Sequence, residues 1–215
     1  MKEYELGLIC GRFSHIHKGH QLLIDKSLEI CKNTIILVGS AQESKTLRNP
    51  FTSDYRIKLI KKIYNCPEIK ISELQDMTNE YDVTSKWGQY VIDKTIEKAG
   101  KMADVIISGN DESRKKWFSK EQTKNVKEIF INKNNLRISA TELRGYLLIN
   151  DKKNWSQYVS EKIIDDFEEI RNILLEVPIY RQILNNMGNN TNIEKYKEIY
   201  QKYEIEDRKE KIKHI

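Results

Sequence analysis

The sequence has few cysteines and no long apolar run. Its three cysteines, Cys10, Cys31 and Cys66, are isolated from one another, and no Cys-x-x-Cys pair occurs. An odd, sparse count argues against a disulfide scaffold and fits a reducing compartment. No apolar run approaches the roughly 20 residues that span a bilayer, and the first residues lack the shape of a signal peptide. We therefore expect a cytoplasmic protein with no membrane-embedded part.

Three common catalytic motifs are also missing from the chain. It contains no Gly-x-x-x-x-Gly-Lys-Ser/Thr loop, no Gly-x-Gly-x-x-Gly fingerprint and no Gly-x-Ser-x-Gly elbow. A P-loop kinase and a hydride-transfer enzyme therefore have little support. The net charge is only +5 over 215 residues, with both signs interspersed. This balance suits small anionic substrates and falls short of a nucleic-acid-binding surface.

Apolar β-branched runs alternate with amphipathic segments along most of the chain. This alternation predicts an α/β fold with a doubly wound parallel sheet, in which ligands bind at the carboxyl ends of the strands. The expected strands are 4–10, 34–38, 69–71, 104–108 and 126–131, and the expected helices are 18–31, 54–64, 85–99 and 141–149.

The segment that follows the first expected strand has the composition of a phosphate-binding loop. It reads Gly-Arg-Phe-Ser-His-Ile-His-Lys-Gly-His over residues 11–20 and leads directly into a helix. His17 and His20 are three residues apart, so they share one face of the first helical turn. Backbone N–H groups at a helix N-terminus attract anions, and Gly11 and Gly19 allow close approach of the backbone. These residues predict phosphate binding.

Two separated motifs resemble one known family. The pattern Gly-x-Phe-x-x-x-His-x-Gly-His over residues 11–20 is similar to the signature of the HxGH nucleotidyltransferases. The second signature of that family, Ile-Ser-x-Thr-x-x-Arg, matches residues 138–144. The motifs stand in the family's order, about 120 residues apart, as one Rossmann-like domain of this size would place them.

Further segments resemble one branch of that family. Residues 39–52 are similar to the loop after the second strand in nicotinamide mononucleotide (NMN) adenylyltransferases of the archaeal and NadM/NadR type. Trp87 with Val91, residues 108–110, and Trp155 with Tyr158 also look like that branch. The resemblance covers roughly residues 4–170 and leaves out the last forty or so.

The resemblance implies roles for particular residues. Catalytic roles fall to His17, His20 and Arg144, and contacts to the acceptor fall to Arg48 and Trp87. The residues expected to bind ATP are Gly11, Arg12, Phe13, Gly19, Gly109, Asn110, Ser139 and Thr141. Magnesium is expected to accompany ATP, held mainly by its phosphates and by water.

The implied activity is transfer of AMP from ATP to NMN, which gives NAD and pyrophosphate. The expected partners are therefore ATP and a mononucleotide, without nucleic acid or membrane, and formation of a homo-oligomer is left open. Another phosphate acceptor is an alternative: nicotinate mononucleotide, phosphopantetheine, or the acceptor of a cytidylyl transfer. A non-catalytic nucleotide-sensing module is the alternative from another class, and the intact motif residues argue against it.

Some of these residues have a plainer structural interpretation. Trp87 could equally be a core residue, and the basic run 114–116 is interpreted as solvated surface, with contact to ATP phosphates as the alternative. A metal site at the three histidines 15, 17 and 20 is disfavoured because no acidic or cysteine partner lies nearby. Residues 14–16 and Thr84 depart from the family pattern, so the shape of the acceptor pocket and its selectivity are open.

The pattern changes after residue 159. Apolar residues recur at helical spacing in two stretches, separated by the turn-rich run Asn-Asn-Met-Gly-Asn-Asn over residues 185–190. We expect a nucleotidyltransferase domain over residues 1–159 and a helical appendage over 160–215. The charges of the appendage nearly balance, so packing against the first domain or a partner subunit is the expected role rather than binding of nucleic acid.

Overall fold

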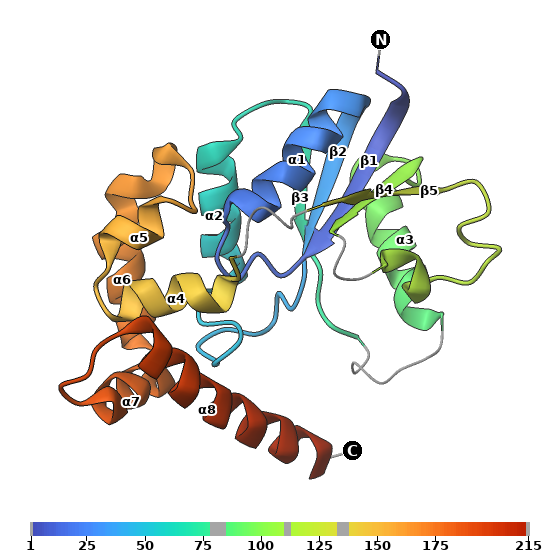
Figure 1. Ribbon diagram of the computed structural model, residues 1–215. Coiled ribbons are helices and arrows are strands. Elements are labelled where there is room, and N and C mark those ends of the chain that lie inside the picture. The colour runs from blue at the N-terminus through green and yellow to red at the C-terminus, as the bar shows by residue number, and fades with distance from the viewer. Residues whose placement is uncertain (1, 78–84, 110–112, 133–137, 214–215) are drawn as a thin grey trace.

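The computed structural model describes residues 2–77, 85–109, 113–132 and 138–213. Its centre is a five-stranded, all-parallel sheet with strand order β3-β2-β1-β4-β5 (Figure 1). The strands are Tyr4–Gly11 (β1), Cys31–Val38 (β2), Ile69–Glu73 (β3), Val105–Gly109 (β4) and Lys127–Ile131 (β5). The predicted doubly wound parallel sheet is confirmed.

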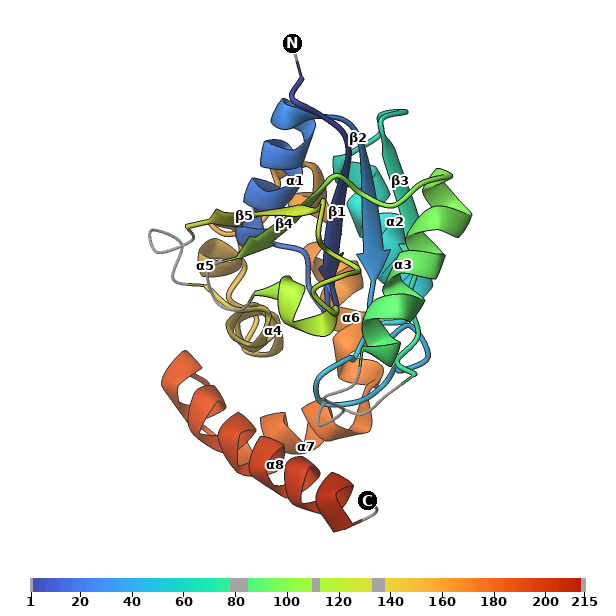
Figure 2. The same ribbon diagram turned by 90° about the vertical axis from the view of Figure 1, so that its right-hand side faces the viewer.

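Helices cover both faces of the sheet, as the two ribbon views show (Figures 1 and 2). Along the chain the helical segments are α1 (Lys18–Ile30), α2 (Ser53–Ile63), α3 (Lys86–Ala99), the 3-10 turn η1 (Arg114–Trp117), α4 (Ala140–Leu148), α5 (Lys152–Ser156), the 3-10 segment η2 (Glu161–Asp166), α6 (Phe167–Glu176), α7 (Pro178–Met187) and α8 (Ile193–Lys213). Helix α3 packs on one face of the sheet, and α1 and α2 pack on the other.

Alternate residues of the central strands belong to different cores. Ile9 and Ile36 pack with α1, α2 and the C-terminal helices, whereas Leu8 and Ile35 pack with α3 and η1. Side chains of a strand point to opposite faces in turn, so a strand buried on both sides reads as a continuous apolar run. This is why the unbroken runs of the sequence predicted these strands correctly.

The boundary between α1 and β2 differs from the expectation. The helix expected over 18–31 ends at Ile30, and Cys31 begins β2 rather than closing the helix. Its N–H still bonds to the carbonyl of Ser27, but its extended backbone pairs in register with Tyr4 of β1. Sheet pairing therefore takes over where the helix pattern alone would continue.

The C-terminal region is helical, as expected, and its first stretch is divided into α6 and α7. Pro178 begins α7 at a position where its missing N–H costs nothing, and Gly188 ends it with a φ of +56°. The buried residues Ile170, Tyr180 and Tyr196 belong to the same core as the face of the sheet that α1 and α2 cover. The core is thus continuous across residue 159, and the two-domain division stays a prediction. In the part of the chain that the structure describes, no helix is long and apolar enough to cross a membrane.

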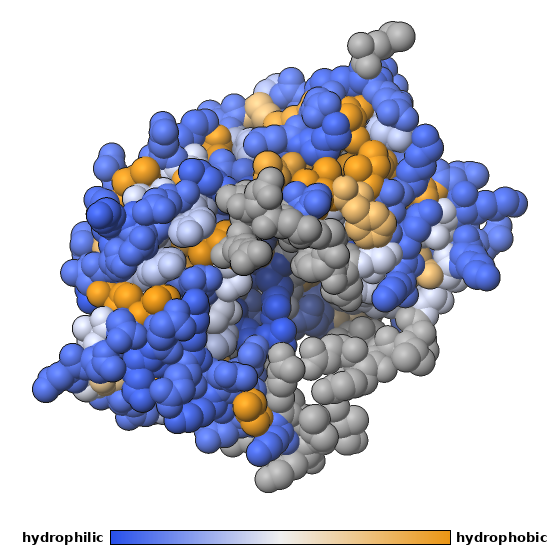
Figure 3. Space-filling model, in the orientation of Figure 1, coloured by the Kyte–Doolittle hydropathy of each residue, from blue (hydrophilic) through white to orange (hydrophobic). Residues whose placement is uncertain are grey.

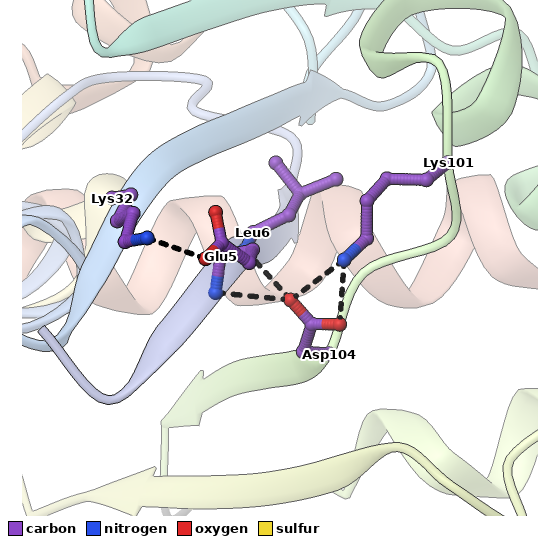
Figure 4. A network of polar contacts seen from close by, with 5 residues as sticks. All are labelled: Glu5, Leu6, Lys32, Lys101 and Asp104. Atoms are coloured by element: carbon purple, nitrogen blue, oxygen red, sulfur yellow. Dashed lines mark hydrogen bonds and ion pairs between the residues drawn. The ribbon is translucent and has the colours of Figure 1, made fainter.

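A carboxylate fastens the amino end of β1 to the segment before β4 (Figure 4). Asp104 accepts hydrogen bonds from the backbone N–H groups of Leu6 (2.9 Å) and Glu5 (3.1 Å), and Lys101 donates to it at 2.8 Å. Lys32 of β2 pairs with the Glu5 side chain at 2.6 Å. Partial burial opposes ionisation, but these hydrogen bonds together hold the pKa of Asp104 below its ordinary value.

We predict that Asp104→Asn lowers the free energy of unfolding at pH 7 by about 1 kcal/mol, because neutral oxygen accepts these hydrogen bonds less strongly. Since the folded-state pKa is depressed, this stabilisation is complete above the ordinary value of 3.8 and is lost as pH falls through the lower folded value. Urea denaturation at pH 7 and at pH 3 measures both effects. Asp93→Asn, on exposed α3 surface, is the control. A stability difference between wild type and Asp104→Asn that persists unchanged at pH 3 would contradict the assignment.

Candidate active site

A cavity of about 750 Å³ opens at the carboxyl ends of β1 and β4. The chain connections leave these two neighbouring strands in opposite directions, and ligands of doubly wound sheets bind at such a point. Figure 3 shows a hollow with a hydrophilic interior near the middle of this face of the molecule. Its walls come from the loop after β1, the first turn of α1, the end of β4, the start of α4 and one side of α8.

His17 is the N-cap of α1, and its ring has a defined orientation. Its Nδ1 accepts a hydrogen bond from the backbone N–H of Gly19 at 3.0 Å. A ring nitrogen that accepts carries no proton, so the neutral ring must hold its proton on Nε2. The cap thereby leaves His17 with a donor nitrogen, which is the group that a phosphate oxygen needs.

The ring of His20 packs at a tilt against two rings of the same loop. Its ring centroid lies 4.0 Å from that of His17 and 4.7 Å from that of Phe13. All three residues line the cavity. The two imidazoles therefore form one surface beside the N-terminus of α1, where the helix dipole also favours negative charge.

The charges that line the cavity are mostly positive. Its described lining includes Arg12, Arg48, Arg114 and Arg144, and Glu204 is the one carboxylate among those residues. Burial lowers the pKa of Arg12, and the neighbouring charges of Arg48 and Arg144 lower it further. The charges of Arg48 and Arg144 therefore act on Arg12 across one space, and a bound polyanion would relieve this repulsion.

Arg144 is buried, and hydroxyl groups hold its guanidinium. Its Nε donates to the hydroxyl of Tyr180 at 2.6 Å, and its Nη2 lies 3.1 Å from both Thr141 Oγ1 and the hydroxyl of Tyr200. Burial disfavours the charged form, but the oxygens of Tyr180, Tyr200 and Tyr196 more than offset this and raise the pKa. Arg144 therefore stays charged at the cavity wall.

His15 is structural. Its ring is 1% exposed, lies between the carbonyl of Ile16 (2.9 Å from Nδ1) and the indole N–H of Trp155 (2.9 Å from Nε2), and does not line the cavity. Because the indole can only donate, Nε2 accepts and Nδ1 carries the proton. Burial lowers the pKa of His15 to about 3, so it stays neutral at physiological pH.

The unusual residues at 14 and 16 also fill structural positions. The hydroxyl of Ser14 lies 2.6 Å from the carbonyl of Arg48 and 2.9 Å from Oδ1 of Asn49, and Ile16 is buried in the core. Ser14 therefore ties the loop after β1 to the loop after β2. The departures from the family pattern at 14–16 are thus accounted for by packing and by contact between these two loops.

A buried arginine, Arg56, also joins the loop after β1 to the loop after β2. The guanidinium of Arg56, on α2, donates to the carbonyls of Arg12 (2.6 Å), Gly39 (2.8 Å) and Ser40 (3.1 Å). Both loops contain a non-glycine residue with left-handed backbone: Phe13 and Ser40 each have a φ of +49°. Such a conformation costs of order 1–3 kcal/mol and persists only where surrounding structure imposes it. The Arg56 side chain supplies that restraint.

The structure brings nearly all of the predicted site residues together. Those that line the cavity are Gly11, Arg12, Phe13, His17, Gly19, His20, Arg48, Gly109, Ser139, Thr141 and Arg144. Asn110 lies outside the described residues, as does Thr84. Trp87 lies apart from the described lining: it packs against Tyr90 and Trp117, on the α3 side of the sheet. Trp117 in turn lies under the cavity residue Arg114, 4.8 Å from its guanidinium.

Sequence reasoning missed Arg56, Tyr180, Tyr200 and Glu204, which line the cavity or hold the residues that do. Arg56 occupies a core position of α2 together with Leu59 and Ile63, so an arginine within an apolar stripe was the available signal. Tyr180, Tyr200 and Glu204 come from α7 and α8, where the pattern indicated only packing. No local signal connects those residues to the loops that they reach.

We predict that Arg56→Met lowers the free energy of unfolding by about 3 kcal/mol, because three carbonyls lose a charged donor in a buried place. Chemical denaturation measures the effect. Arg181→Met, on the exposed side of α7, is the matched control and should change stability by less than about 0.5 kcal/mol. Equal stability of Arg56→Met and wild type would show that the clamp contributes nothing.

Comparisons with known proteins point to one family. Residues 8–212 match the model of the cytidylyltransferase-like family. The nicotinamide-nucleotide adenylyltransferase of Methanococcus vannielii is 31% identical over 165 residues, which are 77% of this chain and 89% of that protein. The enzyme of the same name from Thermococcus sibiricus is 28% identical over 172 residues, covering 78% of this chain and 85% of its own.

Solved structures share the fold. A bifunctional NMN adenylyltransferase/ADP ribose pyrophosphatase from Francisella tularensis, in complex with AMP and a manganese ion, superposes with a TM-score of 0.58 at 19% identity. The match covers 98% of this chain but only 56% of that longer chain. A NadR protein bound to NAD and AMP-PNP gives a TM-score of 0.52 at 15% identity, over 76% of this chain and 46% of its own. The predicted family is confirmed: this chain belongs to the cytidylyltransferase-like, or HxGH, family of nucleotidyltransferases.

Proposed function

We propose that this protein is an NMN adenylyltransferase, which transfers AMP from ATP to NMN and releases pyrophosphate. The observation that carries the proposal is the cavity itself: among the described residues, two histidines in ring contact, two helix N-termini and four arginines face one space at the switch point of the sheet. The similarity to archaeal nicotinamide-nucleotide adenylyltransferases, at about 30% identity, supports the choice of NMN as acceptor.

The residues present suit direct transfer without a covalent enzyme intermediate. A phosphate oxygen of NMN attacks the α-phosphorus of ATP, the bond from that phosphorus to the bridging oxygen breaks, and pyrophosphate leaves with the bond's electron pair. The acceptor brings its own nucleophile, so the protein has to position the two phosphates and stabilise developing negative charge. We assign this task to His17, His20 and Arg144, with Arg48 holding the acceptor phosphate.

We propose that magnesium enters with ATP. Among the described residues, no group of three or more His, Cys, Asp or Glu side chains is placed to hold a metal ion. The donors that line the cavity are mainly cationic, and Mg²⁺ commonly binds through substrate phosphates and water. In this proposal the ion supplies charge neutralisation on the phosphates, and the protein's own residues orient them.

Two other features of the proposal rest on the sequence. The stacking of Trp87 on the nicotinamide ring stays a prediction. Trp87 contacts Trp117, and it is Trp117 that lies against the cavity residue Arg114. The cytoplasmic location likewise stays a prediction. Transfer to another phosphate acceptor remains the second candidate, because the match to the cytidylyltransferase-like family does not name the acceptor.

A pyrophosphate-release assay against a panel of acceptors tests the proposed function. We predict activity with ATP and NMN, lower activity with nicotinate mononucleotide, whose ring carries a carboxylate, and none with phosphopantetheine. CTP in place of ATP tests cytidylyl transfer. If the protein binds ATP but releases no pyrophosphate with either mononucleotide, the assignment of the acceptor fails while the family assignment stands.

We predict that His20→Ala lowers kcat about a hundredfold, the scale for loss of one preorganised donor to the transition state. The fold should survive, because the His20 side chain is partly exposed at the cavity. Initial rates at saturating substrate measure the effect, and thermal melting confirms folding. Lys18→Ala, an exposed residue in the same helical turn that does not line the cavity, is the control. Near-normal turnover of folded His20→Ala would remove this histidine from the mechanism.

A further inference from the structure

The C-terminal helix lies at the active site as well as against the core. In both ribbon views α8 crosses below the carboxyl ends of the strands (Figures 1 and 2). Tyr200 and Glu204 of this helix line the same cavity as the two histidines. Residues from a region that the sequence indicated as an appendage therefore form one wall of the site.

Two tyrosines of this region link Arg144 to the loop that carries Arg48. The hydroxyl of Tyr180 accepts from Arg144 Nε at 2.6 Å and donates to the carbonyl of Leu47 at 2.7 Å. The hydroxyl of Tyr200 accepts from Arg144 Nη2 at 3.1 Å and lies 3.5 Å from the same carbonyl. Each hydroxyl group therefore contacts both the guanidinium of Arg144 and the backbone carbonyl of Leu47, the residue before Arg48.

These contacts define which part of Arg144 faces the ligand. Tyr180, Tyr200 and Thr141 occupy Nε and Nη2, and the guanidinium lies 5.8 Å from the ring centroid of Tyr200. A planar guanidinium held along one side can present only its remaining donors to a phosphate. The tyrosines supply oxygens without negative charge, so the arginine keeps its attraction for an anion.

Helix α4 has a glycine at the point where α8 packs closely against it. A Cβ atom on Gly145, the residue after Arg144, would lie 2.5 Å from Tyr196 Cδ1 and 2.6 Å from Ile193 Cδ1. Both of those residues belong to α8. Glycine at this position lets α8 pack directly against the helix that bears Arg144, which brings the Tyr200 hydroxyl within reach.

We propose that Tyr180 and Tyr200 are positioning residues of the active site: they orient Arg144 toward the triphosphate and hold the Leu47–Arg48 loop in register with it. The inference rests on the proposed function in taking Arg144 as a phosphate-binding residue. The C-terminal helices then serve the reaction itself, through two hydroxyl groups contributed from 36 and 56 residues beyond Arg144.

The test removes each hydroxyl while keeping the ring. Tyr180→Phe and Tyr200→Phe should each lower kcat about tenfold and weaken binding of a non-hydrolysable ATP analogue by threefold or more, because Arg144 loses a partner that sets its direction. Tyr203→Phe is the matched control: its hydroxyl, on the same helix, bonds to Asn186 at 2.9 Å and does not line the cavity. It should change neither quantity by more than about 1.5-fold.

A double-mutant cycle separates positioning from general loss of structure. In an Arg144→Ala background, either tyrosine substitution should lower kcat and ATP-analogue affinity by clearly less than in the wild-type background, because only its contact with the Leu47 carbonyl remains to be lost. Equal losses with and without Arg144, or an equal loss in Tyr203→Phe, would overturn the proposal. Should one variant fail to fold in thermal melting, the cycle with the other tyrosine decides.

The two proposals fail in different ways. The ATP-analogue titration needs no acceptor, so it reports on the tyrosines even if the wild-type protein releases no pyrophosphate with NMN. Such a result would reject NMN as the acceptor, and the affinities of Tyr180→Phe and Tyr200→Phe in the presence and absence of Arg144 would still confirm or reject their positioning role.

Discussion

The site depends on how the chain satisfies backbone carbonyls where parallel strands end. Strands β1 and β2 are neighbours in the sheet, and the loops that follow them lie side by side with backbone carbonyls that need donors. Arg56 supplies a buried cation that bonds to three of those carbonyls, in residues 12, 39 and 40. The left-handed backbone of Phe13 and Ser40 lies within the same restraint. Because these loops are held, the cap formed by His17 and the ring contact of His20 with Phe13 keep a defined position.

The same principle recurs at the opposite wall with a different donor. There the carbonyl of Leu47 accepts from the hydroxyl of Tyr180, and Arg144 donates to that hydroxyl. Arg56 donates its hydrogen bonds to backbone carbonyls and is structural, whereas the guanidinium of Arg144 also lies at the cavity wall. Among the described residues four arginines line the space, so the protein holds positive charge in position before a phosphate arrives. Such preorganisation is the main means by which phosphate-transfer enzymes lower their barrier.

Much of the fold could be predicted because its signals are local. Apolar β-branched runs such as 34–38 indicate buried strands, and the His-x-Gly-His turn indicates the start of α1. One helix boundary was wrong for a reason that is not local: Cys31 reads as the end of a helix but pairs with Tyr4 across the sheet, and this pairing overrides hydrophobic periodicity. After residue 159 the expected helices are present, and Pro178 separates α6 from α7.

By itself the sequence determined the family, the parallel α/β fold and the eleven motif residues that line one cavity, because these follow from short patterns and from the rule that ligands bind at the carboxyl ends of strands. Only the tertiary structure decided what holds them. Arg56 reads as one polar residue in an apolar stripe, and Tyr180 and Tyr200 read as packing residues of an appendage. Their roles arise from contacts spanning 16 to 153 residues of chain, such as those from Arg56 to Ser40 and from Tyr200 to Leu47. No local pattern encodes such contacts, since they exist only after the helices have packed against the sheet.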